Sequence, residues 1–277
     1  MSGALVLVAT PIGNLGELSP RAVDALGSAD VIACEDTRRT GRLLEHAGVA
    51  RPRLLIVNDH TEAAATRTVL GALDDGRTVV VVTDAGTPGI SDPGERLVRA
   101  AVSAGHQVSV VAGPSAAIAA LVVSGLPTGR FVFEGFLPRK GSGRAERLEA
   151  LASERRTIVL YEAPHRVAAT IGDLARALGD DRRVVLVREL TKLHEEVWRG
   201  SLGDAITHLA EVAPRGEYVL VLAGAPEAAP PTRDDIESAL RVQLGAGVDR
   251  KTAVADVARS LGVPKRAVYD VSLGVRL

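Results

Sequence analysis

Aromatic side chains, cysteine and long apolar runs are all scarce in this sequence. Three Phe, three Tyr and one Trp are too few for a binding surface built mainly from stacked bases. The single cysteine, Cys34, excludes an internal disulfide framework and a cysteine-rich zinc site. No apolar run approaches the roughly 20 residues of a membrane span, and the N-terminus lacks the basic start of a signal peptide. We therefore expect a cytoplasmic protein with no membrane segment.

A charge excess of either sign is also missing. The 277 residues carry 33 Lys and Arg against 34 Asp and Glu, a net charge of −1, which excludes a histone-like polycation. The balance is nevertheless uneven along the chain. Residues 138–156 and residues 249–277 each hold six basic and three acidic residues, a local net charge of +3 in both. Such segments favour contact with phosphate groups.

The first half alternates short β-branched runs with helical segments. This pattern predicts a parallel sheet covered by helices on both faces, with strands at 4–9, 31–34, 54–57, 78–83 and 107–111. The second half has strand signals at 130–133, 157–161, 183–188, 196–199 and 218–223. The gap between the third and fourth of these suits a hairpin, so we expect this second sheet to be mixed.

Glycine and proline divide the chain into parts. We predict one α/β domain over residues 1–127, a second over 128–224, a linker over 225–232 and a helical tail over 233–277. The tail has helical segments at 234–244, 251–261 and 264–271. Two short helices broken by a Gly-Val-Pro turn have the size of a helix-turn-helix, and a helical cap on the main body explains them equally well.

Three specialised loops follow predicted strands of the first half. They are TPIGNL (10–15), DAGTPGISDPG (84–94) and GPSA (113–116). Three glycines and two prolines in the second loop allow close backbone approach to a ligand, and Asp84 and Asp92 flank it. Because ligands bind at the carboxyl ends of parallel strands, we expect the loops to form one crevice. None matches a Rossmann or Walker fingerprint.

Charged and polar side chains follow several other strands. Glu35 or Asp36 is a candidate proton acceptor, although acids at a helix start also serve as caps. His60 is a candidate base or substrate contact. Basic residues of 161–166 and 188–192 suit phosphates, with a surface ion-pair network as the alternative. The HEE run at 194–196 lacks the second histidine of a zinc site, so we expect no metal.

Seven motifs in order carry a family resemblance. They are VATPIGNL (8–15), ACEDTR (33–38), DAGTPGISDPG (84–94), GPSA (113–116), EGFLPRK (134–140), YEAPHR (161–166) and RELTKLHEE (188–196). Together they resemble the bacterial 16S rRNA (cytidine-2′-O)-methyltransferases of the tetrapyrrole-methylase superfamily. One departure is Ala163, where that family often has serine.

The resemblance implies two α/β domains with an interdomain cleft, followed by a small helical region. S-adenosylmethionine would bind folded in the cleft. By similarity its contacts fall on Pro11, Asp84, Gly86, Pro88, Ser115, Ala116, Tyr161 and Glu217. The substrate would be a cytidine ribose of 16S rRNA in the assembled small ribosomal subunit, and the enzyme would be a homodimer.

Methylation of a ribose hydroxyl adds a chemical requirement, because this group is a poor nucleophile at neutral pH. We expect the catalytic residues to be Glu35, Asp36 and His60. The residues expected to hold the RNA are Arg38, Arg139, Lys140, Arg166, Arg188 and Lys192. The alternatives are a corrin-type methylase, which needs a roomy apolar cleft, and a nucleic-acid-binding regulator that uses the tail. A hydrolase is disfavoured because the chain has no G-x-S-x-G motif.

Overall fold

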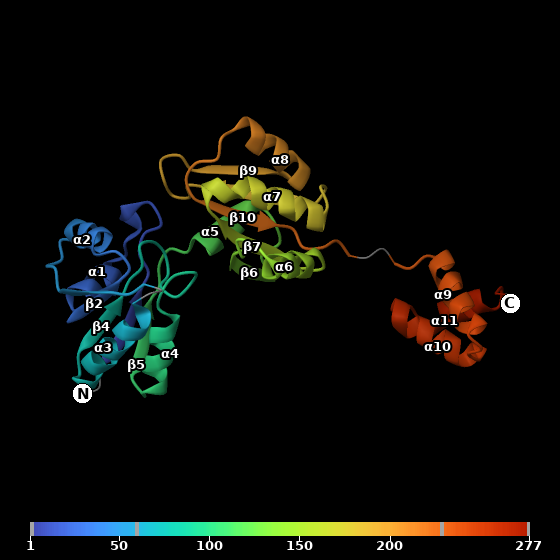
Figure 1. The fold of residues 1–277 in the computed structure, drawn as a ribbon, viewed down its shortest axis with the longest axis horizontal. Helices are drawn as coiled ribbons and strands as arrows, with labels where there is room; N and C mark the ends of the chain where they lie inside the picture. The colour runs from blue at the N-terminus through green and yellow to red at the C-terminus, as the bar shows by residue number, and fades with distance from the viewer. Residues whose placement is uncertain (1–2, 59–60, 228–229, 276–277) are drawn as a thin grey trace. The chain divides into compact units, whose positions relative to one another are not determined.

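The computed structural model describes residues 3–58, 61–227 and 230–275. The chain forms two compact units, Met1–Ala225 and Pro226–Leu277, which we call the body and the tail. The body holds two sheets and the tail is helical (Figure 1). Within the described part of the chain, no helix combines the length and the apolar character needed to cross a membrane.

The first sheet has five parallel strands, as predicted. They are β1 (Ala4–Val8), β2 (Val31–Cys34), β3 (Arg53–Ile56), β4 (Thr78–Val81) and β5 (Gln107–Val111), in the order β3-β2-β4-β1-β5. The central strands are buried on both faces, which explains their unbroken β-branched character. Cys34 is part of this core, 1% exposed.

Helices cover the two faces of this sheet in sequence order. After the 3-10 turn η1 (Leu15–Glu17), helices α1 (Pro20–Gly27) and α2 (Thr37–His46) pack on one face. Helices α3 (Glu62–Asp74) and α4 (Glu95–Ser103) pack on the other. Strands β1 and β4 are neighbours in the sheet, but α1, which follows β1, and α4, which follows β4, lie on opposite faces. This reversal opens a crevice at the carboxyl ends of the two strands.

The second sheet is mixed, as predicted. Its strands are β6 (Phe131–Phe136), β7 (Thr157–Glu162), β8 (Arg183–Arg188), β9 (Glu196–Ser201) and β10 (Tyr218–Leu222), in the order β6-β7-β10-β8-β9. Strands β6 and β7 are parallel, and the other pairs are antiparallel. Helices α6 (Ser142–Ala152), α7 (Pro164–Leu178) and α8 (Leu202–Glu211) supply the core on one face.

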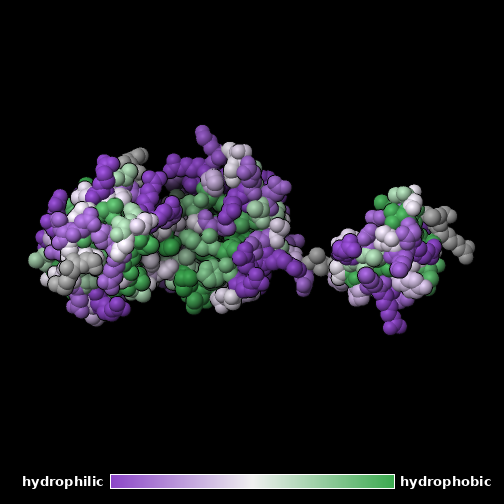
Figure 2. Space-filling view, turned by 90° about the horizontal axis from the view of Figure 1, so that it is seen from below, coloured by the Kyte–Doolittle hydropathy of each residue, from purple (hydrophilic) through white to green (hydrophobic). Residues whose placement is uncertain are grey.

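Helix α5 (Ala116–Ser124) covers the opposite face of the second sheet. Its Ala117 and Leu121 belong to one apolar cluster with Val159 and Val219, although α5 precedes the boundary we predict after residue 127. The helix is apolar on all sides, so Ile118 and Val122 remain 48% and 67% exposed. Figure 2 shows apolar side chains at the body surface.

The tail has its own small core. Helices α9 (Arg233–Gly245), α10 (Arg250–Leu261) and α11 (Lys265–Ser272) pack around Leu240, Val257 and Val268. A capping box of Thr232 and Asp235 starts α9, and the Asp249 side chain caps α10. These helices agree with the predicted segments.

Candidate active site

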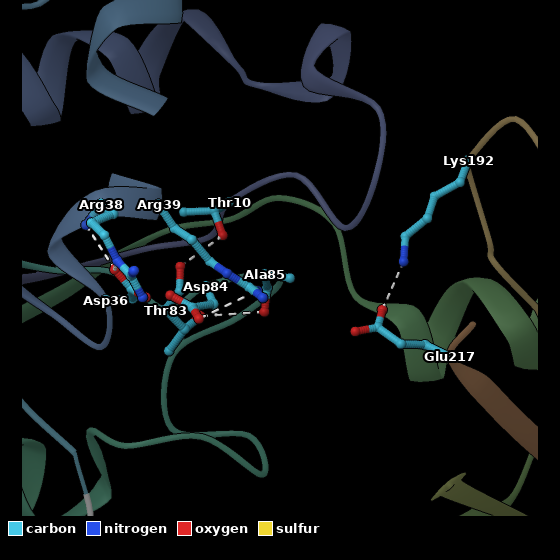
Figure 3. Close-up of polar contacts among 9 residues, drawn as sticks. All are labelled: Thr10, Asp36, Arg38, Arg39, Thr83, Asp84, Ala85, Lys192 and Glu217. Atoms are coloured by element: carbon cyan, nitrogen blue, oxygen red, sulfur yellow. Dashed lines mark hydrogen bonds and ion pairs between the residues drawn. The ribbon is translucent and has the colours of Figure 1, made fainter. Parts of the chain in front are cut away.

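The loops after β1 and β4 are joined to each other. Thr10 and Gly86 exchange two backbone hydrogen bonds of 2.9 and 3.1 Å, and the Thr10 hydroxyl donates to the Thr83 carbonyl at 3.3 Å (Figure 3). Gly86 has a φ of +81°, which a residue with a Cβ adopts only with strain. These bonds hold the first part of the DAGTPGISDPG loop rigid at the crevice.

A cavity of about 490 Å³ lies in the body at the strand ends of both sheets, and we call it the main cavity. Its volume is in the range of small-molecule sites. On the first-sheet side it is lined by Ile12, Glu35, Arg39, Asp84, Gly86, Asp92, Ser115 and Ala116, among others. On the second-sheet side it is lined by Phe136, Tyr161, His165, Lys192, Glu217 and their neighbours.

Asp84 is the acidic residue at the start of the DAGTPGISDPG loop, and it lines the main cavity. Its Oδ2 lies 3.3 Å from a guanidinium nitrogen of Arg39 (Figure 3). Burial raises the pKa of this carboxyl, and Arg39 opposes the rise. Since Asp84 lines the main cavity, its carboxylate is placed to accept a hydrogen bond from a ligand N–H or O–H, and such bonds to a charged group are strong.

An ion-pair network lies at the second-sheet end of the site. The Lys192 ammonium is 2.9 Å from Glu189 and 2.8 Å from Glu217. Burial disfavours the charge of Lys192, but the hydrogen bonds to both carboxylates outweigh it and raise its pKa. Gly13 from the first loop packs against this network, where an added Cβ would lie 2.4 Å from Lys192 Cγ. Only glycine permits this close approach of the two loops.

Three of the seven aromatic residues meet in one group beside the main cavity. Tyr161 contacts Phe133 and Phe136, with ring centroids 5.0 and 5.7 Å away. Its hydroxyl accepts a hydrogen bond of 3.2 Å from the Ala117 backbone N–H at the start of α5. This bond fixes the ring, and the half-exposed Phe136 adds an apolar surface suited to a flat ligand ring.

Asp92 is the carboxyl with the most unusual environment in the cavity. Burial raises its pKa to about 7, and the negative charges of Glu35, Asp84 and Glu217 add to the effect. A second cavity of about 420 Å³ adjoins it and is lined by Glu35, Asn58, Gly89, Ser91, Asp92, Pro93 and Glu95. Glu35, Ser91 and Asp92 line both cavities.

Asp36 occupies a different role from the one expected. It is the N-cap of α2 and accepts from the Arg38 backbone N–H at 2.7 Å, and its other oxygen is 3.1 Å from the Arg38 guanidinium. Hydrogen bonds from Arg38 lower its pKa to about 2. A carboxylate that holds its proton so weakly is a poor base at neutral pH, so the structure favours the capping role of Asp36 over a catalytic one.

Arg166 and Arg188 do not line the main cavity, and both are engaged in ion pairs. Arg166 Nε is 3.1 Å from Glu162, whose side chain is 1% exposed, and another nitrogen donates to the Leu137 carbonyl. Arg188 is 3.1 Å from Glu196. Arg166, in α7, therefore holds together the end of β7 and the segment after β6. This arrangement agrees with the ion-pair alternative rather than with a phosphate contact.

The structure gathers about half of the expected site residues around the main cavity. Those that line it are Glu35, Asp84, Gly86, Ser115, Ala116, Tyr161, Lys192 and Glu217. Those outside its lining are Pro11, Asp36, Arg38, Pro88, Arg139, Lys140, Arg166 and Arg188. Pro11 and Pro88 are buried within the loops, and Arg139 and Lys140 are exposed after β6. His60 lies outside the described residues.

Sequence reasoning missed several residues of the lining. Arg39 directly follows the ACEDTR motif, in which the sequence favours Arg38, and Asp92 lies in the DAGTPGISDPG motif together with the expected Asp84. The helix register decides between Arg38 and Arg39: the first pairs with the cap Asp36 and the second reaches Asp84. Phe136 and His165 likewise lie in the EGFLPRK and YEAPHR motifs. The loop motifs therefore indicate the segments around the main cavity, but they do not say which side chains line it.

Comparison with known proteins places this geometry in a family. The sequence model of the tetrapyrrole (corrin/porphyrin) methylases matches residues 4–206. The chain belongs to this methylase family. It is 48% identical over 273 residues to ribosomal RNA small subunit methyltransferase I of Synechocystis, covering 98% of each chain. It is 47% identical to the protein of that name from Xylella fastidiosa, covering 96% of this chain and 98% of the relative.

The fold of the methylase family agrees with the body. The crystal structure of uroporphyrin-III C-methyltransferase from Thermus thermophilus complexed with S-adenosyl homocysteine matches with a TM-score of 0.55 and 20% identity. The match covers 79% of this chain and 96% of that one. The two-sheet architecture is therefore that of the tetrapyrrole methylases.

Proposed function

We propose that the protein transfers a methyl group from S-adenosylmethionine to the 2′-oxygen of a cytidine ribose in 16S rRNA. The observation that carries the proposal is near-full-length identity of 47–48% to proteins named ribosomal RNA small subunit methyltransferase I. Identity over 96–98% of this chain includes the tail, which the tetrapyrrole methylase match to residues 4–206 does not cover. The assembled small subunit in the cytoplasm is the proposed site of action.

The main cavity has the features that such a methyl donor requires. The Asp84 carboxylate would accept from an amine or ribose hydroxyl, and the apolar group around Tyr161 and Phe136 would contact the adenine. Ser115 and Ala116 line the cavity, and their small side chains would let a ligand come close to the backbone there. When bound, S-adenosylmethionine supplies a methyl group already activated by a sulfonium. The protein has to align the hydroxyl with that group and remove its proton.

Methyl transfer to isolated subunits tests the proposal. We expect tritium from labelled S-adenosylmethionine to enter small ribosomal subunits and to be recovered as 2′-O-methylcytidine. Free 16S rRNA and a tetrapyrrole serve as the compared acceptors. Label in the tetrapyrrole alone would contradict the proposal and favour a corrin-type methylase.

The exposed basic residues after β6 are proposed to contact RNA phosphates. Arg139 and Lys140 are exposed and have no ion-pair partner among the described residues. Three other basic residues of 138–156, namely Arg144, Arg147 and Arg156, instead pair with Asp173, Glu134 and Glu154. The sequence count of +3 therefore overstates the positive charge available for RNA there.

Replacing both Arg139 and Lys140 by glutamine should weaken subunit binding about 3- to 30-fold at moderate salt and reduce the slope of log K against log salt by up to about 2. The matched control is Arg77→Gln with Arg176→Gln, which removes the same charge from exposed ion pairs. Filter binding over a salt series measures both. Equal effects of the two double variants would show that net charge matters and not this site.

The tail and a second copy of the chain complete the proposed assembly. We propose that the tail extends the RNA footprint, since residues 249–277 carry a net charge of +3. Deleting residues 226–277, which form a separate unit, should weaken subunit binding and leave the body folded. Unchanged binding would remove the tail from the proposal.

We further propose a homodimer, supported by the exposed Ile118 and Val122 of α5 and tested by sedimentation equilibrium.

A further inference from the structure

Asp92 lies where the main cavity and the second cavity meet. It lines both, together with Glu35 and Ser91. The main cavity has the apolar wall around Tyr161. The second cavity is lined, besides Asp92, by the polar residues Glu35, Asn58, Ser91 and Glu95 and by Gly89 and Pro93. A ligand with an apolar ring therefore suits the first, and a polar sugar suits the second. A group at the junction can touch both.

We propose that the Asp92 carboxylate accepts the proton of the ribose 2′-hydroxyl, and that it becomes available as a base only when the cationic methyl donor occupies the main cavity. This inference rests on the proposed function. In the step, the hydroxyl oxygen forms a bond to the methyl carbon while the carbon–sulfur bond breaks. The electron pair of that bond stays on sulfur, which becomes a neutral thioether. The hydroxyl proton goes to Asp92 and from there to water.

The charges around Asp92 explain why it requires a bound cation. Acidic side chains face it from three elements: Glu35 after β2, Asp84 after β4 and Glu217 before β10. The two nearby cations are already paired, Arg39 with Asp84 and Lys192 with Glu217. Tyr161, Glu162, His165 and Tyr218 are the other titratable groups of the main cavity wall, and Glu95 adds a carboxyl in the second cavity. The Asp92 charge raises the pKa of Tyr161. Ionised Asp92 is thus short of positive charge.

A sulfonium in the main cavity would supply that charge. The pKa of Asp92, about 7 in the free protein, would fall when a cation binds nearby, and the carboxyl would release its proton. The base would therefore form only beside a bound methyl donor. Binding of S-adenosylmethionine should therefore release protons. Binding of S-adenosylhomocysteine, which has no charge on sulfur, should release fewer protons.

Calorimetry on the full chain tests this coupling without turnover. At about pH 7, titrations in phosphate and in Tris, which have different heats of ionisation, give the number of protons released. We expect the wild type to release about half a proton with S-adenosylmethionine and clearly less with S-adenosylhomocysteine. Asp92→Asn should remove this difference between the two ligands while changing the Kd for S-adenosylhomocysteine less than about threefold. The matched control Glu95→Gln, which lines only the second cavity, should keep it.

Single-turnover methylation of small subunits completes the test. Asp92→Asn should lower the rate about 10²- to 10⁴-fold, the usual range for loss of a general base. A rate within fivefold of wild type, or an unchanged proton release, would overturn the role of Asp92. If the wild type releases protons but does not methylate subunits, the proposed substrate fails instead.

Thermal unfolding shows that the variant is folded and checks the charge environment. The pKa of Asp92 is higher in the folded protein than in the unfolded chain. As pH rises from about 4 to 7, the unfolded chain therefore releases this proton before the folded protein does, and the free energy of unfolding falls. Asp92→Asn removes this loss. It should therefore melt higher than wild type at pH 8 and show a smaller advantage at pH 5, whereas a lower melting temperature at pH 8 would contradict the burial of an uncompensated carboxylate.

Discussion

Replacing Arg166 by methionine should lower the free energy of unfolding of the body by about 3–5 kcal/mol. The reason is the Glu162 carboxylate, whose side chain is 1% exposed. Arg166 is its cationic partner at 3.1 Å, and the remaining bonds come from the Thr170 hydroxyl at 2.6 Å and the Ala163 N–H at 2.9 Å. Without Arg166 a buried negative charge loses its counter-ion. Denaturant unfolding followed by circular dichroism measures the loss.

Two further variants separate this effect from a general loss of charge. Arg176→Met removes an arginine that is 75% exposed and paired with Asp173, and it should cost less than about 1 kcal/mol. Combining Arg166→Met with Glu162→Gln should recover part of the stability, because no charge is then buried. If Arg166→Met folds as stably as the wild type but binds subunits weakly, the residue contacts RNA as the sequence suggested.

Replacing Asp84 by alanine should weaken S-adenosylhomocysteine binding about 10- to 150-fold. This range corresponds to the roughly 1.5–3 kcal/mol of a hydrogen bond to a charged group. Asp84 lines the main cavity, where its carboxylate is the group placed to accept a hydrogen bond from the ligand. The substitution also leaves Arg39 without its carboxylate. Isothermal titration calorimetry gives the Kd directly.

A matched control for this prediction is Asp75→Ala. Asp75 is 61% exposed and pairs with Arg77 outside the cavity lining, so the Kd should stay within about twofold of wild type. Burial raises the pKa of Asp84, so wild-type binding should weaken as pH falls and the carboxylate takes a proton. A Kd for Asp84→Ala within threefold of wild type would show that the Asp84 carboxylate does not bind the cofactor.

The sequence predicted the two sheets closely, because buried strands and amphipathic helices leave periodic patterns that do not depend on distant residues. Both the parallel first sheet and the mixed second sheet were confirmed. The packing of helix α5 was harder to predict from the sequence. The helix is apolar on every side, so no pattern said which sheet it covers, and it packs on the sheet that follows it. Its partner is chosen by Val159 and Val219, far along the chain.

The sequence by itself determined the succession of strands and helices along the chain and the loops that follow the strands. Through the motifs in these loops it also determined the methylase family. The tertiary structure decided which charges are available. Asp36 caps a helix, Arg166 neutralises buried Glu162, and Asp92 lies among carboxylates from three elements. The physical reason is that a side chain's pKa and partners depend on burial and on charges brought together by folding. Motifs give the residues, and only the fold gives each of them its electrostatic environment.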